Sequence, residues 1–191
     1  MDLERGAEVT FKWVTAGAPL ADARQLIAEF GDKSTVDLGF QDFEAELANL
    51  PAPYSAPGGG LLVVRVGDEP AGCCAFKAAP PCDYPNAAEL KRLYVRKIFR
   101  GFGLGQQLVE HCMTAAAAAG YDCLLLDTLD ERETVRGLYS QLGFEVIPPY
   151  SREETKDTDD TDNTDYTDEM DESLKTRQLL CRYFFATFLL L

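Results

Sequence analysis

The stretch that decides the fold is AELKRLYVRKIFRGFGLGQQLVEHCMTAAAAAG, residues 88–120. Alternating apolar side chains predict a strand over residues 90–95. Apolar residues at helical spacing then predict a helix over about residues 103–119, which Gly120 would end. Residues 96–102 lie between the two elements and form a turn rich in glycine and cations.

Three glycines, Gly101, Gly103 and Gly105, stand where this helix begins. A ligand can closely approach a backbone without side chains, and the free N–H groups at a helix N-terminus favour an anion. Positive charge is added on the same side by Arg96, Lys97 and Arg100. The spacing matches neither the dinucleotide glycine fingerprint nor the Walker pattern. The residues therefore leave two interpretations open: a phosphate or diphosphate site, and a glycine-rich turn with solvated cations.

Three motifs in order resemble one family. Leu93-Tyr94-Val95 followed by Arg100-Gly101-Phe102-Gly103-Leu104-Gly105 resembles the Arg/Gln-x-x-Gly-x-Gly/Ala signature of the GNAT superfamily of N-acetyltransferases. Residues 124–128 (LLLDT) resemble the family's fifth strand, and residues 138–144 (LYSQLGF) resemble its Leu-Tyr-x-x-x-Gly-Phe box. The resemblance covers about residues 8–150 and the final strand, and is closest to the small, bacterial-type members.

The resemblance implies an α/β fold with a mixed sheet of about seven mostly antiparallel strands, a splayed parallel central pair and four helices. Hydrophobic patterning predicts its elements along the chain. The strands are expected at 9–15, 61–66, 71–77, 90–95, 122–128, from 144, and within 179–191, and the helices at 19–30, 38–50, 103–119 and 131–142. Residues 1–150 together with 179–191 would form the acetyltransferase domain.

Residues 151–178 break this pattern with an Asp/Thr-rich acidic tract. Its span 152–177 carries eleven acidic and four basic residues, a net charge of −7 out of −14 for the whole chain. Like charges and few apolar residues predict disorder, so we expect a loop inserted before the last strand. A calcium-binding loop is disfavoured because Asp165 stands where such loops require glycine.

The composition and the N-terminal sequence limit the expected partners and cell compartment. An acidic chain of 191 residues argues against nucleic acid and anionic membranes as partners. Residues 1–12 show no secretory signal, and the six cysteines include no Cys-x-x-Cys pair. We therefore expect a cytoplasmic protein with reduced thiols and no metal, and a homodimer stays open.

The resemblance implies acetyl-CoA as co-substrate. Its diphosphate would lie on the backbone of Gly101, Phe102, Gly103, Leu104, Gly105 and Gln106, with Arg100 adding charge. The pantetheine arm would pair with the backbone of Leu93, Tyr94 and Val95, in the gap between the splayed strands. Family members often carry an asparagine seven residues before the tyrosine of the Leu-Tyr box, where this chain has Arg132.

The same resemblance suggests catalytic residues. Tyr139 matches the tyrosine that protonates the departing thiolate, although its apolar helical stripe would also suit a core residue. For the base there are two candidates: Glu89, which opens the predicted central strand, and Asp127. Phe40, Phe43 and Tyr54 fall on the acceptor side of the family fold, where packing explains them best.

Three functional hypotheses follow. The first is direct transfer of an acetyl group to the primary amine of a small molecule. The second is acetylation of a protein or peptide amine, for which the acidic tract could recruit basic chains. The third is a CoA-binding module without catalysis.

Overall fold

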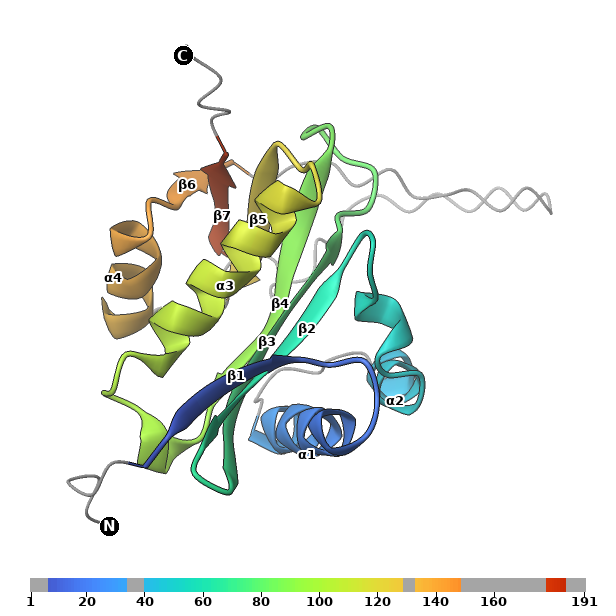
Figure 1. Ribbon diagram of the computed structural model, residues 1–191. Coiled ribbons are helices and arrows are strands. Elements are labelled where there is room, and N and C mark those ends of the chain that lie inside the picture. Colours follow the sequence, from blue (N-terminus) through green and yellow to red (C-terminus); the bar gives the residue numbers. More distant parts are fainter. Residues whose placement is uncertain (1–6, 34–39, 129–132, 149–177, 185–191) are drawn as a thin grey trace, which may run out of the picture.

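The computed structural model describes residues 7–33, 40–128, 133–148 and 178–184. Its strands form one seven-stranded sheet in the order β1-β2-β3-β4-β5-β7-β6 (Figure 1). The strands are β1 (Val9–Trp13), β2 (Gly60–Val66), β3 (Glu69–Ala78), β4 (Ala87–Val95), β5 (Cys123–Thr128), β6 (Glu145–Ile147) and β7 (Gln178–Tyr183). The helices are α1 (Ala18–Lys33), α2 (Phe40–Ala48), α3 (Leu104–Ala118) and α4 (Glu133–Gln141), with short 3-10 turns η1 (Ala52–Tyr54) and η2 (Lys97–Phe99).

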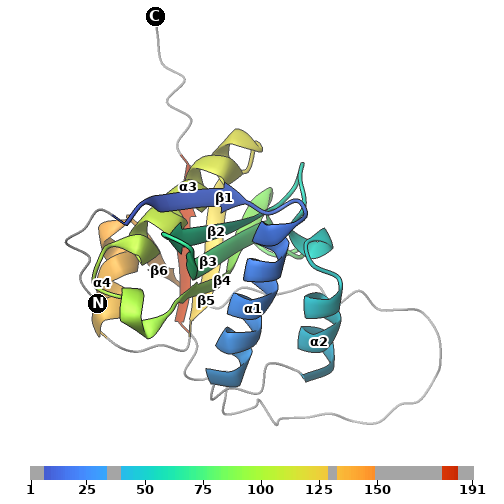
Figure 2. The same cartoon turned by 60° about the horizontal axis from the view of Figure 1, so that its bottom comes forward.

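The helices cover both faces of the sheet (Figures 1 and 2). The face under α3 and α4 holds the larger apolar cluster, which includes Leu62, Leu108, Leu124 and Phe144. The face under α1 holds a second cluster, in which Leu26 and Ile27 pack on Val63. Alternating strand residues supply the two clusters, as their period of two requires. The predicted fold class is confirmed.

The central pair is the one parallel contact in the described sheet. Register pairs join Ala87 to Cys123, Ala88 to Leu124 and Glu89 to Leu125, and no described residue further along β4 pairs with β5. Every other neighbouring pair of strands is antiparallel. The expected splay of the central pair is therefore present, and it begins directly after Glu89.

Some boundaries differ from the prediction. β4 begins at Ala87, so Glu89 lies inside the strand and faces Lys77 of β3 instead of opening the strand. β7 ends at Tyr183 and pairs antiparallel with β6, as expected for the last two strands. The predicted acidic insertion lies outside the described residues, apart from Gln178. None of the helices described here combines the length and the apolar character that a membrane crossing needs.

Candidate active site

The glycine turn gives α3 a start without a side-chain cap. Gly101 and Gly103 have φ of 86° and 73°, the left-handed region in which glycine is unstrained. Gly103 is the N-cap, no side chain caps it, and the N–H of Gln107 donates to its carbonyl at 3.1 Å. The N–H groups of the first turn, which belong to residues 104–106, precede this bond and have no intrahelical acceptor. Helix geometry thus presents several amide donors at one spot.

The first turn of α3 lies beside the end of β4. A Cβ atom added at Gly105 would lie 3.8 Å from Cγ2 of Val95, which is an ordinary contact distance. Packing therefore does not require glycine at this position, although alanine is the better helix former. A ligand that approaches the backbone closely would require it. This cradle, which a methyl group would partly fill, fits the diphosphate of coenzyme A.

The three cations near the turn have different positions. Arg100 is exposed, and its Nε donates to the carbonyl of Val95 at 2.9 Å; Lys97 is also exposed. Arg96 does not belong with them. Its Nη2 and Nε bind the two carboxylate oxygens of Glu29 on α1 at 2.6 and 3.0 Å, and its Nη1 donates to the carbonyl of Pro70. The expectation that Arg96 adds charge to the anion site is wrong, because its guanidinium joins the segment directly after β4 to α1.

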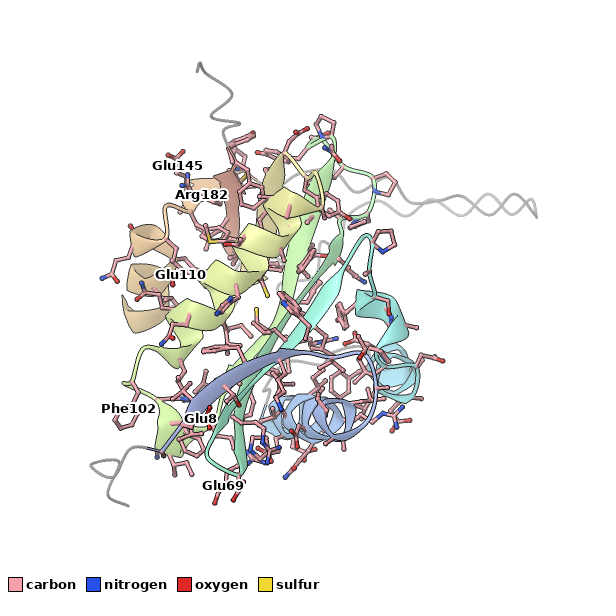
Figure 3. All side chains as sticks on the ribbon, viewed as in Figure 1. Glu8, Glu69, Phe102, Glu110, Glu145 and Arg182 are labelled. Atoms are coloured by element: carbon pink, nitrogen blue, oxygen red, sulfur yellow. The ribbon has the colours of Figure 1, made fainter. Side chains whose placement is uncertain are left out.

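Side chains of the predicted cofactor segment point in different directions. Leu93 and Val95 pack against the α3 cluster, whereas Tyr94 is buried on the opposite face, where its hydroxyl donates to Glu29. Leu104 is buried, so it can offer a ligand only its backbone. Phe102 is 55% exposed and projects outward from the turn (Figure 3). On the exposed side of α3, Gln106 donates from Nε2 to Glu110 at 2.9 Å.

A β-bulge interrupts β4 just after the parallel pairing stops. On β3, Cys73 is opposite Tyr94 and Ala75 is opposite Lys91, so two residues of β4, Arg92 and Leu93, stand against Cys74. Arg92 has φ of 56°, which is uncommon for a residue other than glycine. A bulge bends a strand and re-aims its peptide groups. The backbone of β4 therefore leaves its regular ladder at Arg92 and Leu93, close to the last residue that pairs with β5 on the described strand.

Glu89 is the buried acid of this region, with 2% of its surface exposed. Its Oε1 is 2.7 Å from Nζ of Lys91, two residues along the same face of β4. Such a charge partner offsets the cost of burying the carboxylate.

Tyr139 and Asp127, the other catalytic candidates, lie on α4 and β5. Tyr139 is 6% exposed and packs in the larger apolar cluster, on the face under α3 and α4. Its ring meets that of Phe144 edge-on, with 5.5 Å between the ring centroids. Asp127 is half-buried on β5, opposite Leu179 of β7. Glu89 and Tyr139 thus approach the splayed strands from opposite faces of the sheet. Arg132 lies outside the described residues.

Residues 23–144 match the model of the acetyltransferase (GNAT) family. The chain belongs to this family. An uncharacterised N-acetyltransferase of Schizosaccharomyces pombe is 37% identical over 131 residues, 69% of this chain and 79% of that protein. An IAA acetyltransferase of Azospirillum brasilense is 31% identical over 135 residues, 70% of this chain and 84% of its own length.

Solved GNAT structures share the fold. The structure of a Bacillus subtilis acetyltransferase in complex with CoA superposes with a TM-score of 0.58, at 16% identity, over 93% of this chain and 99% of that one. Membership of the GNAT family makes the chain an acetyl-CoA-dependent acyltransferase. Within the described residues, no group of three or more His, Cys, Asp or Glu side chains is arranged to hold a metal ion.

Sequence reasoning missed one polar cluster of this GNAT domain. Arg92 at the bulge binds Glu46 of α2, which also accepts a hydrogen bond from the hydroxyl of Tyr54 at 2.8 Å. The partners are far apart in the chain, so no local pattern marks them. The available signal was a break in the alternation of the strand. Leu90 and Leu93 are three residues apart, so in a regular strand they would face opposite sides of the sheet, yet both pack in the cluster under α3.

Proposed function

We propose that this GNAT enzyme transfers an acetyl group from acetyl-CoA directly to the primary amine of a small molecule. The observation that carries the proposal is the end of the β4–β5 pairing after Glu89, next to a helix start built from bare glycines. A β4 edge that no described strand pairs with beyond Glu89, together with uncapped helix N–H groups, suits a ligand with amides at one end and phosphates at the other.

The cofactor segment would bind in two parts. The N–H groups of residues 101–106 would hold the diphosphate, with the exposed Arg100 adding charge from the same turn. The backbone of Leu93, Tyr94 and Val95 would hydrogen-bond the amides of the pantetheine arm as an added strand does. Bound in this way, acetyl-CoA would have its thioester at the bulge, between the faces that carry Glu89 and Tyr139.

The chemistry is an acyl transfer in which a C–N bond forms and a C–S bond breaks. As the amine attacks, negative charge grows on the thioester oxygen, and a backbone N–H of β4 near Val95 would stabilise it. Such a donor is worth roughly 3 kcal/mol. Collapse of the tetrahedral intermediate expels the thiolate, to which Tyr139 would give its phenolic proton.

The amine must lose a proton before or during attack. An alkylamine with a pKa near ~10 is mostly protonated at neutral pH, so a carboxylate within reach would help. Glu89 is the preferred base because it lies next to the point of splay. It is opposite Lys77, on the same face of β3 as Ala75, which packs in the cluster under α1. Asp127 remains the second candidate, further along β5.

An acceptor screen tests the proposal. Purified protein, acetyl-CoA and a panel of small amines and peptides are assayed for release of free CoA thiol. Small amines should turn over faster than peptides; the reverse order would point to a protein acceptor. Release without any acceptor dependence, or no release at all, would contradict the proposed reaction.

The Tyr139→Phe variant tests the acid. The substitution keeps the ring that packs on Phe144 and removes only the hydroxyl. We expect kcat to fall about 100-fold while calorimetry gives an unchanged affinity for CoA. Full activity of the variant would remove Tyr139 from the mechanism.

A further inference from the structure

Arg92 of β4 contacts both helices on the acceptor side, α1 and α2. Arg92 forms a bidentate ion pair with Glu46 of α2: Nε lies 2.8 Å from Oε1, and Nη2 lies 2.7 Å from Oε2. Both side chains are largely buried, with 15% and 16% of their surface exposed. The guanidinium also lies over the rings of Phe30 on α1 and Phe43 on α2, 5.8 and 5.0 Å from their centroids.

The ion pair stays charged at neutral pH. Burial raises the pKa of Glu46, but the hydrogen bonds and charge of Arg92 and the hydroxyl of Tyr54 outweigh it, so its pKa is lowered overall. A buried, bidentate Arg–carboxylate pair fixes orientation as well as distance, because the two planar groups match each other. Arg92 is therefore held much more tightly than an exposed cation would be.

The backbone of Arg92 explains why such a hold is needed. Arg92 lies in the bulge with φ of 56°, in the left-handed region, which is sterically unfavourable for residues that have a Cβ atom. Without an anchor, the strand can relieve this strain by returning to a regular ladder. A one-residue shift would turn Leu93, Tyr94 and Val95 to the opposite faces. The ion pair opposes that shift, because Arg92 cannot move without leaving its carboxylate partner buried.

We propose that Arg92, anchored by Glu46, is a positioning residue for acetyl transfer: it holds the bulge so that a backbone N–H of residues 93–95 points at the thioester oxygen. This inference rests on the proposed function above. Arg92 itself touches neither acetyl-CoA nor the acceptor; it acts through the backbone. The same ion pair fixes α2 against β4. The acceptor would therefore be positioned relative to the same strand that holds the thioester.

Three variants separate this role from simple stabilisation. Arg92→Ala removes the anchor but keeps the backbone strain, Arg92→Lys keeps the charge but loses the bidentate fork, and Glu46→Gln weakens the pair from the other side. The matched control is Asp22→Asn. Asp22 pairs with Arg65 and likewise joins a sheet strand, β2, to an acceptor-side helix, α1, but it does so away from the bulge.

The main readout is the carbonyl stretch of acetyl-CoA labelled with ¹³C at the acetyl carbonyl, measured by difference infrared spectroscopy on the complex without acceptor. Wild-type and Asp22→Asn protein should shift this band to lower frequency, because an aimed N–H polarises the carbonyl. Glu46→Gln and Arg92→Ala should lose most of the shift, and Arg92→Lys should lose part of it. Each variant should still bind CoA in calorimetry, because the turn of residues 101–106 proposed to hold the diphosphate is unchanged.

Kinetics give the second readout. With an acceptor that turns over, kcat of Glu46→Gln and Arg92→Ala should fall about 10- to 100-fold, by a larger factor than their affinity for CoA falls, whereas the kcat of Asp22→Asn and its KM for acetyl-CoA should stay near wild type. An unchanged carbonyl band in folded Glu46→Gln protein would overturn the inference. If wild-type protein binds acetyl-CoA but acetylates nothing, the proposed function fails, and the infrared comparison still decides the role of Arg92.

Discussion

Replacing Gly105 with alanine should make the free protein more stable and its complex with CoA weaker. Gly105 lies in the first turn of α3, and an added Cβ would make an ordinary 3.8 Å contact with Val95 Cγ2, without a clash. Alanine in a helix is favoured over glycine by about 0.5–1 kcal/mol. For a chain of this size, that corresponds to a rise in melting temperature of roughly 1–4 °C.

The effect on binding has the opposite sign. The new methyl group would occupy space between the end of β4 and the N–H groups of α3, where the diphosphate is proposed to lie. Loss of one hydrogen bond to a charged group costs about 1.5–3 kcal/mol, so the dissociation constant for CoA should rise about 10- to 100-fold. A gain in stability combined with a loss of affinity is not expected from general damage to the fold.

Thermal unfolding without ligand and calorimetry with CoA measure the two effects separately. Gly137→Ala is the matched control, because Gly137 lies in α4 and an added Cβ would meet nothing within 4 Å. It should stabilise the protein by a similar amount and leave the affinity for CoA unchanged. If Gly105→Ala raised the melting temperature yet bound CoA within twofold of wild type, the diphosphate could not lie on this turn.

Three further outcomes are expected. Gly103→Ala should destabilise the protein by about 1–2 kcal/mol in urea unfolding, because φ of 73° strains any side chain; unchanged stability would contradict the left-handed cap. At pH values above 4.5, the usual pKa of a glutamate, Glu46→Gln should have a lower free energy of unfolding than wild type. Because the pKa of Glu46 is lowered in the folded protein, this difference should shrink as the pH falls below 4.5 and Glu46 becomes protonated. A maleimide near neutral pH should label Cys82 first, because the other five cysteines are buried and burial raises the pKa of Cys181 to about 12; fast labelling elsewhere would argue against the core packing.

Much of the fold could be predicted because its signals are local. Period-two runs marked the strands and period-3.6 runs marked the helices. The boundary errors also have local causes: β4 begins at Ala87 because Ala87 and Ala88 pair with β5, a contact that the sequence does not display. The hairpin of β2 and β3 was predictable from Gly67-Asp68-Glu69-Pro70, and the two strands are antiparallel neighbours.

The glycine turn was the part of the site that the sequence marked. Gly101 and Gly103 both have positive φ, a conformation that favours glycine, so the glycines in the sequence indicated the shape of the turn. Charge is a weaker signal, because a cation in the sequence does not say what it binds. Arg96 and Arg100 both stood near the turn, yet Arg96 is bound by Glu29, sixty-seven positions away.

The bulge was missed because the residue at its left-handed position is arginine. Glycine there would have suggested a break in the strand, whereas Arg92 reads as an ordinary exposed strand residue. Its partner Glu46 is forty-six positions away and looks like the solvated side of α2. Only the tertiary structure joins the strained backbone, the carboxylate and the two phenylalanine rings into one unit.

The positions of these arginines suggest how the acceptor side is kept in place. Arg92 binds α2 through Glu46, and Arg96 binds α1 through Glu29, so both helices are tied to the strand that is proposed to hold the thioester. Apolar packing alone is not directional and would let each helix slide. A bidentate ion pair opposes that movement, because sliding would separate two partly buried charges that are paired in the folded protein. The cost of this separation falls on any state in which an acceptor helix moves relative to β4, so the distance between amine and thioester would be set by the same strand that is proposed to polarise the carbonyl.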